Sequence, residues 1–326
     1  MIIDAHRHVI VPEITARTVP EAWRPSVWPA AGRSVVSFRG RQIDSVLGEF
    51  SDVDAILAEA AATGVDHLLL SPWINLVPVD AAPRDAQLVC QLQNEALVRL
   101  VAAEPRLSAV GAVPLQDPEL AARELTGLAA AGLAGVEVPS SVAGRYLGDD
   151  SFLPFWAAAE DCAALVFIHP TTRGFGIEAL DSYYLWNSAG NPLETAVTAA
   201  HIAMAGVLER FPSLRVLLAH GGGALPVLRG RLRRAYAVRP EAAARTRHGP
   251  DWSLRRFYYD SVTHDAALLA DLVGYAGAGQ VLLGSDQPFD MGSDNCVAEV
   301  RALGLGRDEE LILGGTAGQL LAMADA

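Results

Sequence analysis

Lysine is absent from the 326-residue chain, in which all 25 basic residues are arginine. A Schiff-base lysine, a P-loop lysine and a carbamylated lysine that bridges two metal ions are therefore excluded. Only three cysteines are present, Cys90, Cys162 and Cys296, and they form no CxxC pair. Scattered thiols are typical of buried cysteines in a reducing compartment rather than of disulfides or a zinc knuckle.

Positive charge and long apolar runs are also scarce. The 38 acidic residues outnumber the basic ones and give a formal net charge of −13, which argues against nucleic acid or an anionic membrane as partner. No apolar run reaches the roughly 18 residues that span a bilayer. The opening MIIDAHRH lacks the basic and apolar segments of a signal peptide. We therefore expect a cytoplasmic protein that binds neither membranes nor nucleic acid.

Apolar material is abundant by contrast, because 51% of the residues are hydrophobic and 19% are charged. Short apolar runs alternate with longer helical patterns, which predicts an α/β fold with βα units around a parallel sheet. No repeat or linker divides the chain, so residues 1–326 are predicted to form one domain. Eight candidate strands suit a single (β/α)8 TIM-type barrel: 2–5, 66–71, 108–113, 135–138, 165–169, 215–219, 257–260 and 280–284.

Helical patterns cover residues 52–63, 84–103 and 118–131, and Asp117 before Pro118 predicts an N-cap. Two other segments are longer than simple connections. Residues 9 to about 50 are rich in proline, tryptophan and arginine, and are predicted to form an insertion after strand 1, over one mouth of the barrel. Residues 171 to about 191 directly follow a predicted strand, and loops of this length are usually functional or disordered.

Five polar residues at the ends of predicted strands indicate the chemistry. His6 and His8 lie two residues apart, so their side chains point to the same face of a strand. This pair alone is a weak signal for a metal. His169, His220 and Asp286 end three further apolar runs. Because the carboxyl ends of barrel strands meet at one mouth, and buried imidazoles need ligands or hydrogen bonds, the five residues together predict a metal site.

The segments DAHRH, FIHP, LLAHGGGALP and LLGSDQPF, in this order and spacing, resemble the amidohydrolase superfamily. Within it they resemble the α-amino-β-carboxymuconate-ε-semialdehyde decarboxylase-like family. The similarity extends over essentially the whole chain and includes VPLQDPELA, NPLETA and VLERFPSL. It implies a TIM-type barrel with one divalent metal ion.

By this resemblance, the metal ligands are His6, His8, His169 and Asp286. His220 matches the family's catalytic histidine, which contacts the metal-bound water. Three imidazoles and one carboxylate suit Zn²⁺, and the harder ions Mn²⁺ or Co²⁺ less so.

The resemblance also implies three substrate-binding residues. Arg39 matches an arginine that holds a substrate carboxylate, which a guanidinium grips through two parallel hydrogen bonds. Arg231 follows AHGGG and matches an arginine that reaches the neighbouring subunit's active site, which implies a homodimer. Trp186 lies where the family has an aromatic residue lining the pocket. Without the resemblance, the two arginines are equally compatible with a solvated surface, and Trp186 with core or lid packing.

The chain departs from the family pattern beside the site. Thr316 replaces the asparagine of the usual GNA motif, Gln287 follows the aspartate where an aromatic residue is common, and Arg7 separates the two histidines. Thr171-Thr172 replaces the Trp-Asp that often follows FIHP. These changes bear on the substrate more than on the metal. Asp260, which ends the run FYYD, is a candidate for a supporting role behind the ligands.

The function that the resemblance implies is a metal-dependent, nonoxidative decarboxylation of an unsaturated or aromatic carboxylic acid. The same metal-bound water supports two alternatives, hydrolysis of a small carboxylate-bearing substrate and hydration of a double bond. A barrel that only binds a metal or an acid is a third alternative, which the intact ligand set and His220 disfavour. In every case the expected partner is a small carboxylate.

Overall fold

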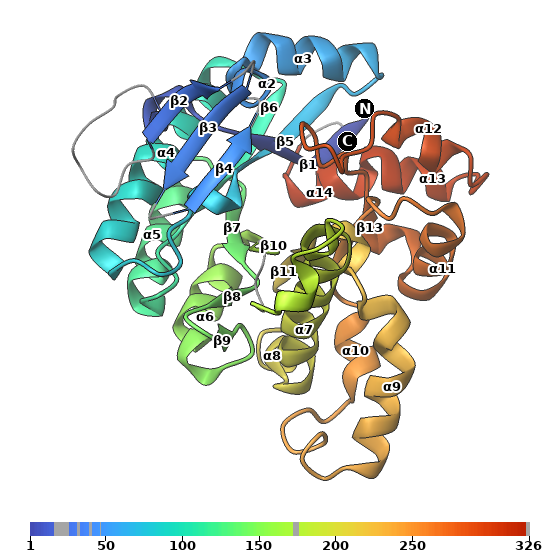
Figure 1. Cartoon of the computed structure of the whole chain (residues 1–326). Coiled ribbons are helices and arrows are strands. Elements are labelled where there is room, and N and C mark those ends of the chain that lie inside the picture. The colour runs from blue at the N-terminus through green and yellow to red at the C-terminus, as the bar shows by residue number, and fades with distance from the viewer. Residues whose placement is uncertain (16–25, 31–32, 39–40, 46, 172–175, 324–326) are drawn as a thin grey trace.

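The computed structural model describes residues 1–15, 26–30, 33–38, 41–45, 47–171 and 176–323. Eight parallel strands form one sheet in the order β1-β5-β6-β7-β10-β11-β12-β13 (Figure 1). The predicted barrel architecture is thus confirmed. The strands are β1 (Ile3–Val9), β5 (His67–Pro72), β6 (Leu107–Ala112), β7 (Gly135–Pro139), β10 (Leu165–His169), β11 (Arg215–Leu218), β12 (Tyr258–Asp260) and β13 (Val281–Leu282).

The sheet closes on itself between β1 and the segment that follows β13. Asp286 N donates to His6 O at 2.8 Å, and His8 N donates to Gln287 O at 2.9 Å. Three of the predicted site residues therefore lie on the closing seam, with their backbones hydrogen-bonded across it.

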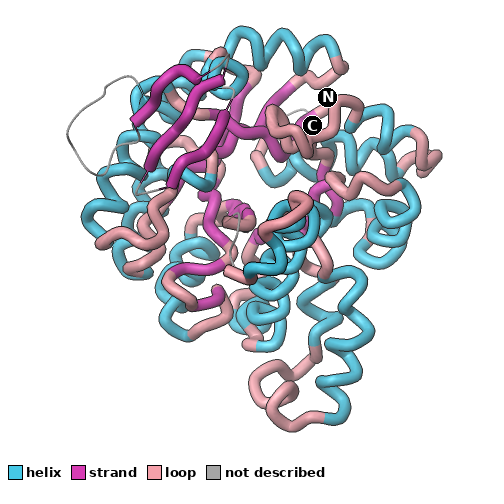
Figure 2. Tube along the Cα trace, in the orientation of Figure 1, coloured by secondary structure: helices cyan, strands magenta, loops and turns pink. Residues whose placement is uncertain are grey.

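Helices surround the barrel, as Figure 2 shows in cyan around the magenta strands. The longer ones are α3 (Val53–Ala62), α4 (Pro83–Ala103), α5 (Pro118–Ala130), α6 (Leu153–Asp161), α7 (Asn191–Met204), α9 (Leu225–Val238) and α11 (Ala266–Ala276). The shorter ones are α1 (Pro12–Thr15), α2 (Leu47–Ser51), α8 (Val207–Arg210), α10 (Pro250–Leu254), α12 (Cys296–Arg301), α13 (Asp308–Glu310) and α14 (Thr316–Leu320). In the described part of the chain, no helix combines the length and the apolar character needed to cross a membrane.

The three predicted helices agree with α3, α4 and α5 to within one residue at each end. Asp117 caps α5 as expected, because its carboxylate accepts a hydrogen bond from Leu120 N at 3.1 Å. Pro118 follows in the first turn, where the missing N–H has no partner within the helix.

Side chains of the barrel strands fill the interior below the mouth. Ile3, Leu69, Val110, Phe167 and Leu217 belong to one buried apolar cluster that also includes residues of α14. The α14 end of this cluster lies where the strands begin, since the Arg215 side chain at the start of β11 donates to Leu320 O at 3.2 Å. Packed apolar side chains therefore fill the end of the barrel where the strands begin. The polar residues of the predicted site lie at the opposite end, where the strands finish.

A β-bulge between Asp4 and Arg7 interrupts β1 at the first of the two histidines. Asp4 pairs with Leu68 of β5, but Arg7 pairs with Leu70. Three steps along β1 thus match two steps along β5, which inserts one extra residue.

The bulge decides which way the histidines face. Ala5 belongs to the interior cluster, so strict alternation would turn His6 outward. The extra residue shifts the alternation, and both His6 and His8 point inward. Arg7 points outward instead, where its guanidinium donates to Glu59 Oε2 at 2.7 Å. The charge between the two histidines is therefore directed away from the mouth.

A small antiparallel sheet lies in the segment predicted to be an insertion. It consists of β2 (Ser26–Ala30), β3 (Arg33–Phe38) and β4 (Arg41–Ser45), in that order, drawn in blue in Figure 1. Two short strands, β8 (Ser141–Val142) and β9 (Arg145–Tyr146), form a hairpin after β7.

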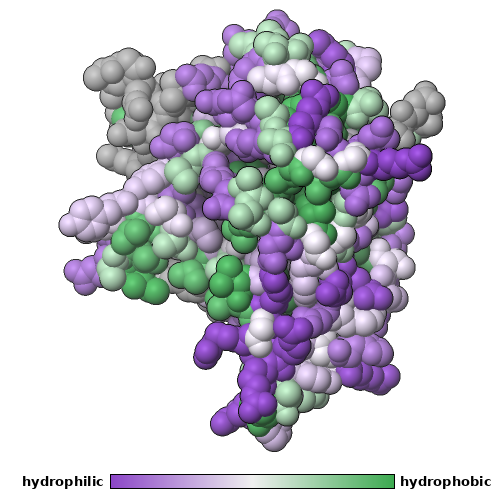
Figure 3. All heavy atoms as spheres, turned by 90° about the vertical axis from the view of Figure 1, so that its right-hand side faces the viewer, coloured by the Kyte–Doolittle hydropathy of each residue, from purple (hydrophilic) through white to green (hydrophobic). Residues whose placement is uncertain are grey.

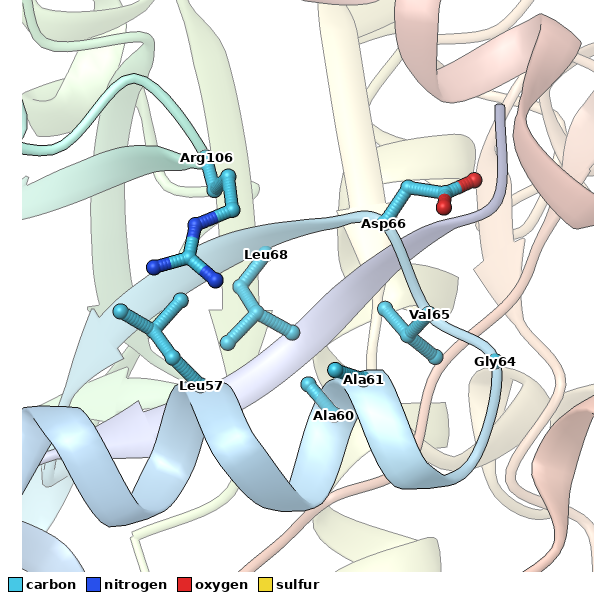
Figure 4. Close-up of a pocket in the computed structure, with 8 residues that line it drawn as sticks. All are labelled: Leu57, Ala60, Ala61, Gly64, Val65, Asp66, Leu68 and Arg106. Carbon is cyan, nitrogen blue, oxygen red and sulfur yellow. The ribbon is translucent and has the colours of Figure 1, made fainter.

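A cleft of about 200 Å³ lies on the outside of the barrel, between α3 and the start of β5 (Figure 4). Its two charged residues are already engaged. Asp66 accepts a hydrogen bond from Ile2 N at 2.7 Å, and Arg106 pairs with Glu104 at 2.8 Å. Both residues precede their strands, so the cleft lies at the end of the barrel away from the predicted site. Because both charged side chains already have partners, the cleft suggests no ligand.

Candidate active site

Five side chains from strands β1 and β10 and from the segments after β11 and β13 converge at the mouth. Donor atoms of His6, His169, His220 and Asp286 all lie within 4.8 Å of one another. His8 Nε2 lies 3.0 Å from His6 Nε2 and 3.1 Å from Asp286 Oδ1. The structure thus brings together the five residues to which the sequence analysis assigned the metal and the proton transfer.

Each of the three most buried imidazoles has its Nδ1 held from outside the cluster. His6 Nδ1 lies 2.6 Å from Asp260 Oδ2, and His8 Nδ1 lies 3.1 Å from Ser71 Oγ. His169 Nδ1 lies 3.0 Å from the carbonyl oxygen of the next residue. With hydrogen on Nδ1, each ring directs the lone pair of Nε2 into the cluster, as metal-binding histidines do.

The cluster fits one divalent cation. His169 Nε2 is buried, and within the described residues it has no hydrogen-bond partner. A buried polar atom without a partner is costly unless a ligand occupies the space beside it. The Nε2 atoms of His6, His8 and His169 and the Asp286 carboxylate form the mixed N,O donor set that binds divalent transition metals in proteins.

The charges in the cluster depend on one another. Burial opposes ionisation of Asp286, but the nearby His6 and hydrogen bonds from the histidines outweigh it and hold the pKa of Asp286 well below its usual range. Burial also opposes a charge on His6, yet Asp286 and Asp260 raise the pKa of His6 to about 10. Burial lowers the pKa of His8 and of His169. The cluster therefore combines one stable carboxylate with two imidazoles, His8 and His169, for which burial favours the neutral form, and with His6, whose charged form is favoured by the two aspartates while no metal is bound.

Asp260, at the end of β12, connects His6 to the turn that carries His220. Its Oδ2 contacts His6 Nδ1 and accepts a hydrogen bond from His220 N at 2.8 Å. Its Oδ1 accepts hydrogen bonds from Gly221 N at 2.7 Å and Val262 N at 3.0 Å. One fully buried carboxylate thus fixes both the His6 ring and the His220 backbone.

Asp260→Ala is expected to lower the free energy of unfolding. Three backbone N–H groups lose their acceptor, and each buried donor left without one costs roughly 1–3 kcal/mol, so the loss should reach at least about 3 kcal/mol. Urea unfolding of the metal-free proteins measures it. Asp260→Asn, which keeps an oxygen of similar placement, should lose less. Equal stability of Asp260→Ala and the unmodified protein would contradict the anchoring role.

The glycine-rich turn after β11 holds His220 toward the mouth. A Cβ at Gly222 would lie 2.7 Å from the ring of Tyr259, and one at Gly223 would lie 2.2 Å from Pro192 O. Both positions also have a positive φ, so only glycine fits. The side chain of His220 remains 17% exposed, whereas the other four members of the cluster are at most 5% exposed. His220 is therefore the member most open to a substrate.

The structure describes two of the three predicted substrate-binding residues, Arg231 and Trp186. Arg39 lies outside the described residues. Arg231 is exposed on α9. Its neighbours Arg229 and Arg233 form ion pairs with aspartates of α11 and α10, as expected for a basic helix face.

Trp186 lies in a short helical turn of residues 186–190, before α7. It is partly buried, and Tyr184 packs edge to face against it with ring centroids 4.8 Å apart. The Tyr184 hydroxyl donates to Asp290 Oδ1 at 2.9 Å, four residues after Asp286. The loop that carries Trp186 is therefore tied to the Asp286 segment.

Two buried acids beside the cluster are absent from the sequence predictions. Glu137 in β7 is 0% exposed, and its Oε1 lies 4.0 Å from His8 Nδ1. Burial raises the pKa of Glu137 well above its usual range. Glu194 in α7 accepts hydrogen bonds from Thr171 N at 3.0 Å and Thr171 Oγ1 at 2.6 Å. The available signal for Glu137 was one acid inside the apolar run GVEV.

The family model for amidohydrolases matches residues 3–321 of the chain. The chain belongs to the amidohydrolase family. This amidohydrolase is 29% identical over 296 residues to 2-amino-3-carboxymuconate-6-semialdehyde decarboxylase from Dictyostelium discoideum, which covers 89% of this chain and 82% of the relative. The resemblance drawn from its motifs is thereby confirmed.

Solved structures share the architecture of this amidohydrolase. The 5-carboxyvanillate decarboxylase from Sphingomonas paucimobilis superimposes with a TM-score of 0.81 at 24% identity, covering 98% of each chain. A dihydroxybenzoic acid decarboxylase from Polaromonas sp. gives a TM-score of 0.82 at 23% identity, covering 100% of this chain and 98% of the other. At these identities the likeness establishes the common fold.

Proposed function

We propose that this amidohydrolase is a metal-dependent, nonoxidative decarboxylase, a carbon–carbon lyase, of an unsaturated or aromatic carboxylic acid. The observation that carries the proposal is the convergence of four imidazoles and Asp286 at the mouth of a barrel whose chain resembles a decarboxylase over most of its length. A cytoplasmic location is part of the proposal, on the ground of the three free cysteines.

His6, His8, His169 and Asp286 would hold one divalent ion. Their donor set suits Zn²⁺, which we propose first, and Mn²⁺ is the alternative that the manganese-bound decarboxylase from Polaromonas sp. supports. A bound ion would supply Lewis-acid polarisation of the substrate. Asp260 and Ser71 would keep the rings of His6 and His8 oriented through their Nδ1 atoms.

His220 would transfer the proton. Its Nε2 lies 3.2 Å from Asp286 Oδ2, and its ring is the most exposed of the cluster. The proton would pass from the imidazole to the substrate carbon that carries the carboxylate. A C–H bond forms there as the C–C bond breaks, and its electron pair passes through the conjugated system while CO₂ leaves. The charge balances without an oxidant or a reductant.

Arg39, Arg231 and Trp186 would position the substrate. A chain with a net charge of −13 repels an anion at long range, so local guanidinium groups must supply the attraction at short range. Trp186 would limit the pocket on the side of the Tyr184 loop.

A homodimer would bring Arg231 to a second chain's mouth. Val227, 72% exposed, lies one helical turn before Arg231 on α9 and shares its face. Leu193, 39% exposed, lies on α7, which packs against α9. Figure 3 shows hydrophobic surface across the middle and lower left of the side of the molecule that it presents. Exposed apolar side chains beside a substrate-binding arginine support a shared interface.

Release of CO₂ tests the reaction. The metal-loaded protein should release CO₂ from at least one member of a panel of unsaturated and aromatic acids, and the product should carry hydrogen in place of the carboxylate. A product formed by hydrolysis, or by addition of water to a double bond, without CO₂ would instead support the hydrolase or hydratase alternative.

Mixing two inactive variants tests the shared site. Arg39→Ala and Arg231→Ala should each lose most activity but retain the metal. In a mixed dimer, one mouth would carry both lesions and the other none, so subunit exchange should restore part of the activity. Arg234→Ala, on the same helix, serves as the matched control and should remain active. Confirmed exchange without recovered activity, or full activity as a monomer, would refute the shared site.

A further inference from the structure

Asp4 opens the DAHRH segment but is not among the proposed metal ligands. Its neighbours Ile3 and Ala5 belong to the interior cluster, so alternation along β1 turns the Asp4 side chain to the outer face of the barrel wall. The residue is nevertheless only 1% exposed. A carboxylate buried in this way requires hydrogen bonds from the protein around it.

Within the described residues, three hydrogen bonds hold this carboxylate, and all three come from the closing seam of the barrel. Asp4 Oδ1 accepts from His6 N at 3.1 Å and from Ser285 N at 3.0 Å. Asp4 Oδ2 accepts from the Ser285 hydroxyl at 2.5 Å. Asp4 therefore connects the backbone of one proposed ligand, His6, to the residue directly before another, Asp286.

The Ser285 side chain lies on the same outer face as Asp4. Leu283, two residues earlier, belongs to the outer apolar core. Gly284 between them faces inward, because a Cβ at this position would lie 2.9 Å from His6 Cβ. Since residues two apart on an extended strand share a face, the Asp4–Ser285 contact lies behind the seam, and the His6 imidazole lies in front of it.

The same carboxylate lies at the β-bulge of β1, where the register with β5 is interrupted between Asp4 and Arg7. A bulge takes backbone N–H groups out of the regular strand ladder, and an aspartate two residues earlier can accept one of them in a local turn. The hydrogen bond from His6 N to Asp4 Oδ1 is such a contact. Because the bulge turns His6 and His8 inward, Asp4 contributes to the direction of both rings.

Asp286 depends on its neighbours for its position, because its backbone φ is +58°. Left-handed backbone is uncommon for a residue with a side chain, and it persists where surrounding contacts hold it. Asp4 holds the N–H of Ser285, and Asp286 N itself donates to His6 O at 2.8 Å. These contacts keep Asp286 Oδ1 at 3.1 Å from His6 Nε2.

We propose that Asp4 is a positioning residue of the metal site. Its carboxylate joins the His6 and Asp286 segments behind the seam and thereby sets the separation of their donor atoms. The inference rests on the metal site of the proposed function, in which both residues are ligands. Removal of Asp4 should weaken metal binding about 10- to 100-fold, as loss of a hydrogen-bonding partner behind the ligands does.

Metal affinity of the full-length Asp4→Ala variant tests the proposal. Metal-free protein would be titrated with Zn²⁺ and with Mn²⁺ against a chromophoric chelator, and circular dichroism under the same conditions would show that the variant is folded. The Kd for each ion should rise about 10-fold or more, because the two ligands lose their fixed separation. The EPR spectrum of bound Mn²⁺ should also differ from that of the unmodified protein.

Glu209→Ala is the matched control, because this carboxylate makes the same kinds of hydrogen bond as Asp4 but outside the cluster. Glu209 in α8 accepts from one hydroxyl and two backbone N–H groups, those of Thr246, Arg247 and His248. Its removal should lower the free energy of unfolding in urea. Both dissociation constants and the EPR spectrum should be unchanged.

Two further substitutions separate the positioning of the ligands from the loss of a buried charge. Asp4→Asn keeps an oxygen for the two N–H groups, and its amide can donate to the Ser285 hydroxyl, so it should retain most of the metal affinity. Asp4→Ser can accept from His6 N but is too short to reach across the seam. It should lose affinity in the same direction as Asp4→Ala, and it replaces that variant if Asp4→Ala fails to fold.

Unchanged Kd values in folded Asp4→Ala or Asp4→Ser protein would overturn the assignment. An equal loss of affinity in Glu209→Ala would also overturn it, because the effect would then follow stability alone. Asp4→Asn as weak as Asp4→Ala would assign the effect to charge instead of position. Failure of the proposed function is distinguishable, because a protein that binds metal through this arrangement but releases no CO₂ refutes only the decarboxylation.

Discussion

His220→Asn is expected to reduce turnover by about 10²-fold or more while the metal stays bound, the usual scale for loss of a general acid or base. Asparagine can still donate a hydrogen bond toward Asp286, but it cannot carry a proton between pH 5 and 9. His220 also differs from the buried histidines in its exposure, which lets it meet a substrate. Its removal should therefore affect the reaction more than the binding of the ion.

Steady-state kinetics on metal-loaded protein, with metal content determined on the same samples, would measure this effect. His201→Asn is the matched control, because His201 stacks on Tyr146 with ring centroids 4.8 Å apart, away from the cluster. Its kcat should be unchanged. A metal-loaded His220→Asn protein with normal kcat would rule out the proton-transfer role.

Asp286→Ala should lose most of the bound metal and, with it, essentially all activity. Among the residues that the structure describes, Asp286 is the one carboxylate that contacts His6, His8 and His220 together, at 3.1–3.2 Å. Its removal leaves imidazoles without a balancing charge in a site that is almost fully buried. We expect the affinity for a divalent ion to fall at least about 100-fold, since ligands contribute more than their supporting groups.

Chelator competition and elemental analysis would give the affinity and the stoichiometry. His6→Ala should show the same direction of change, because it also leaves an incomplete ligand set. Asp290→Asn, on the same segment but outside the cluster, should retain the metal. Normal metal content in Asp286→Ala would show that the ion binds elsewhere.

Much of the fold could be predicted from the sequence because short apolar runs alternate with helical patterns along most of the chain. Asp117 before Pro118 located the start of α5, and its side chain caps the helix as expected. The boundaries were less accurate where irregular backbone intervenes. The first strand was predicted as 2–5, whereas β1 continues to Val9 through the bulge. The last strand was predicted as 280–284, whereas β13 is only Val281–Leu282.

The candidate ligands could be named without a structure, because an imidazole or carboxylate that ends an apolar strand must lie at the mouth once the strands are parallel. His169, His220 and Asp286 satisfy this rule without any knowledge of their distances. The spacing of His6 and His8 likewise determined that they share a face, but not which face.

The remaining features of the site depend on contacts between residues that are distant in the chain. The bulge between Asp4 and Arg7 turns the histidines inward, and it depends on the register with β5, whose paired residues lie 63 or 64 positions later in the chain. Asp260 and Glu137 acquire their relation to His6 and His8 only when the ring of strands closes. The local sequence shows which side chains alternate along one strand. The distance between side chains on opposite walls of the barrel is set only when all eight strands close into a ring, because every strand contributes to the diameter.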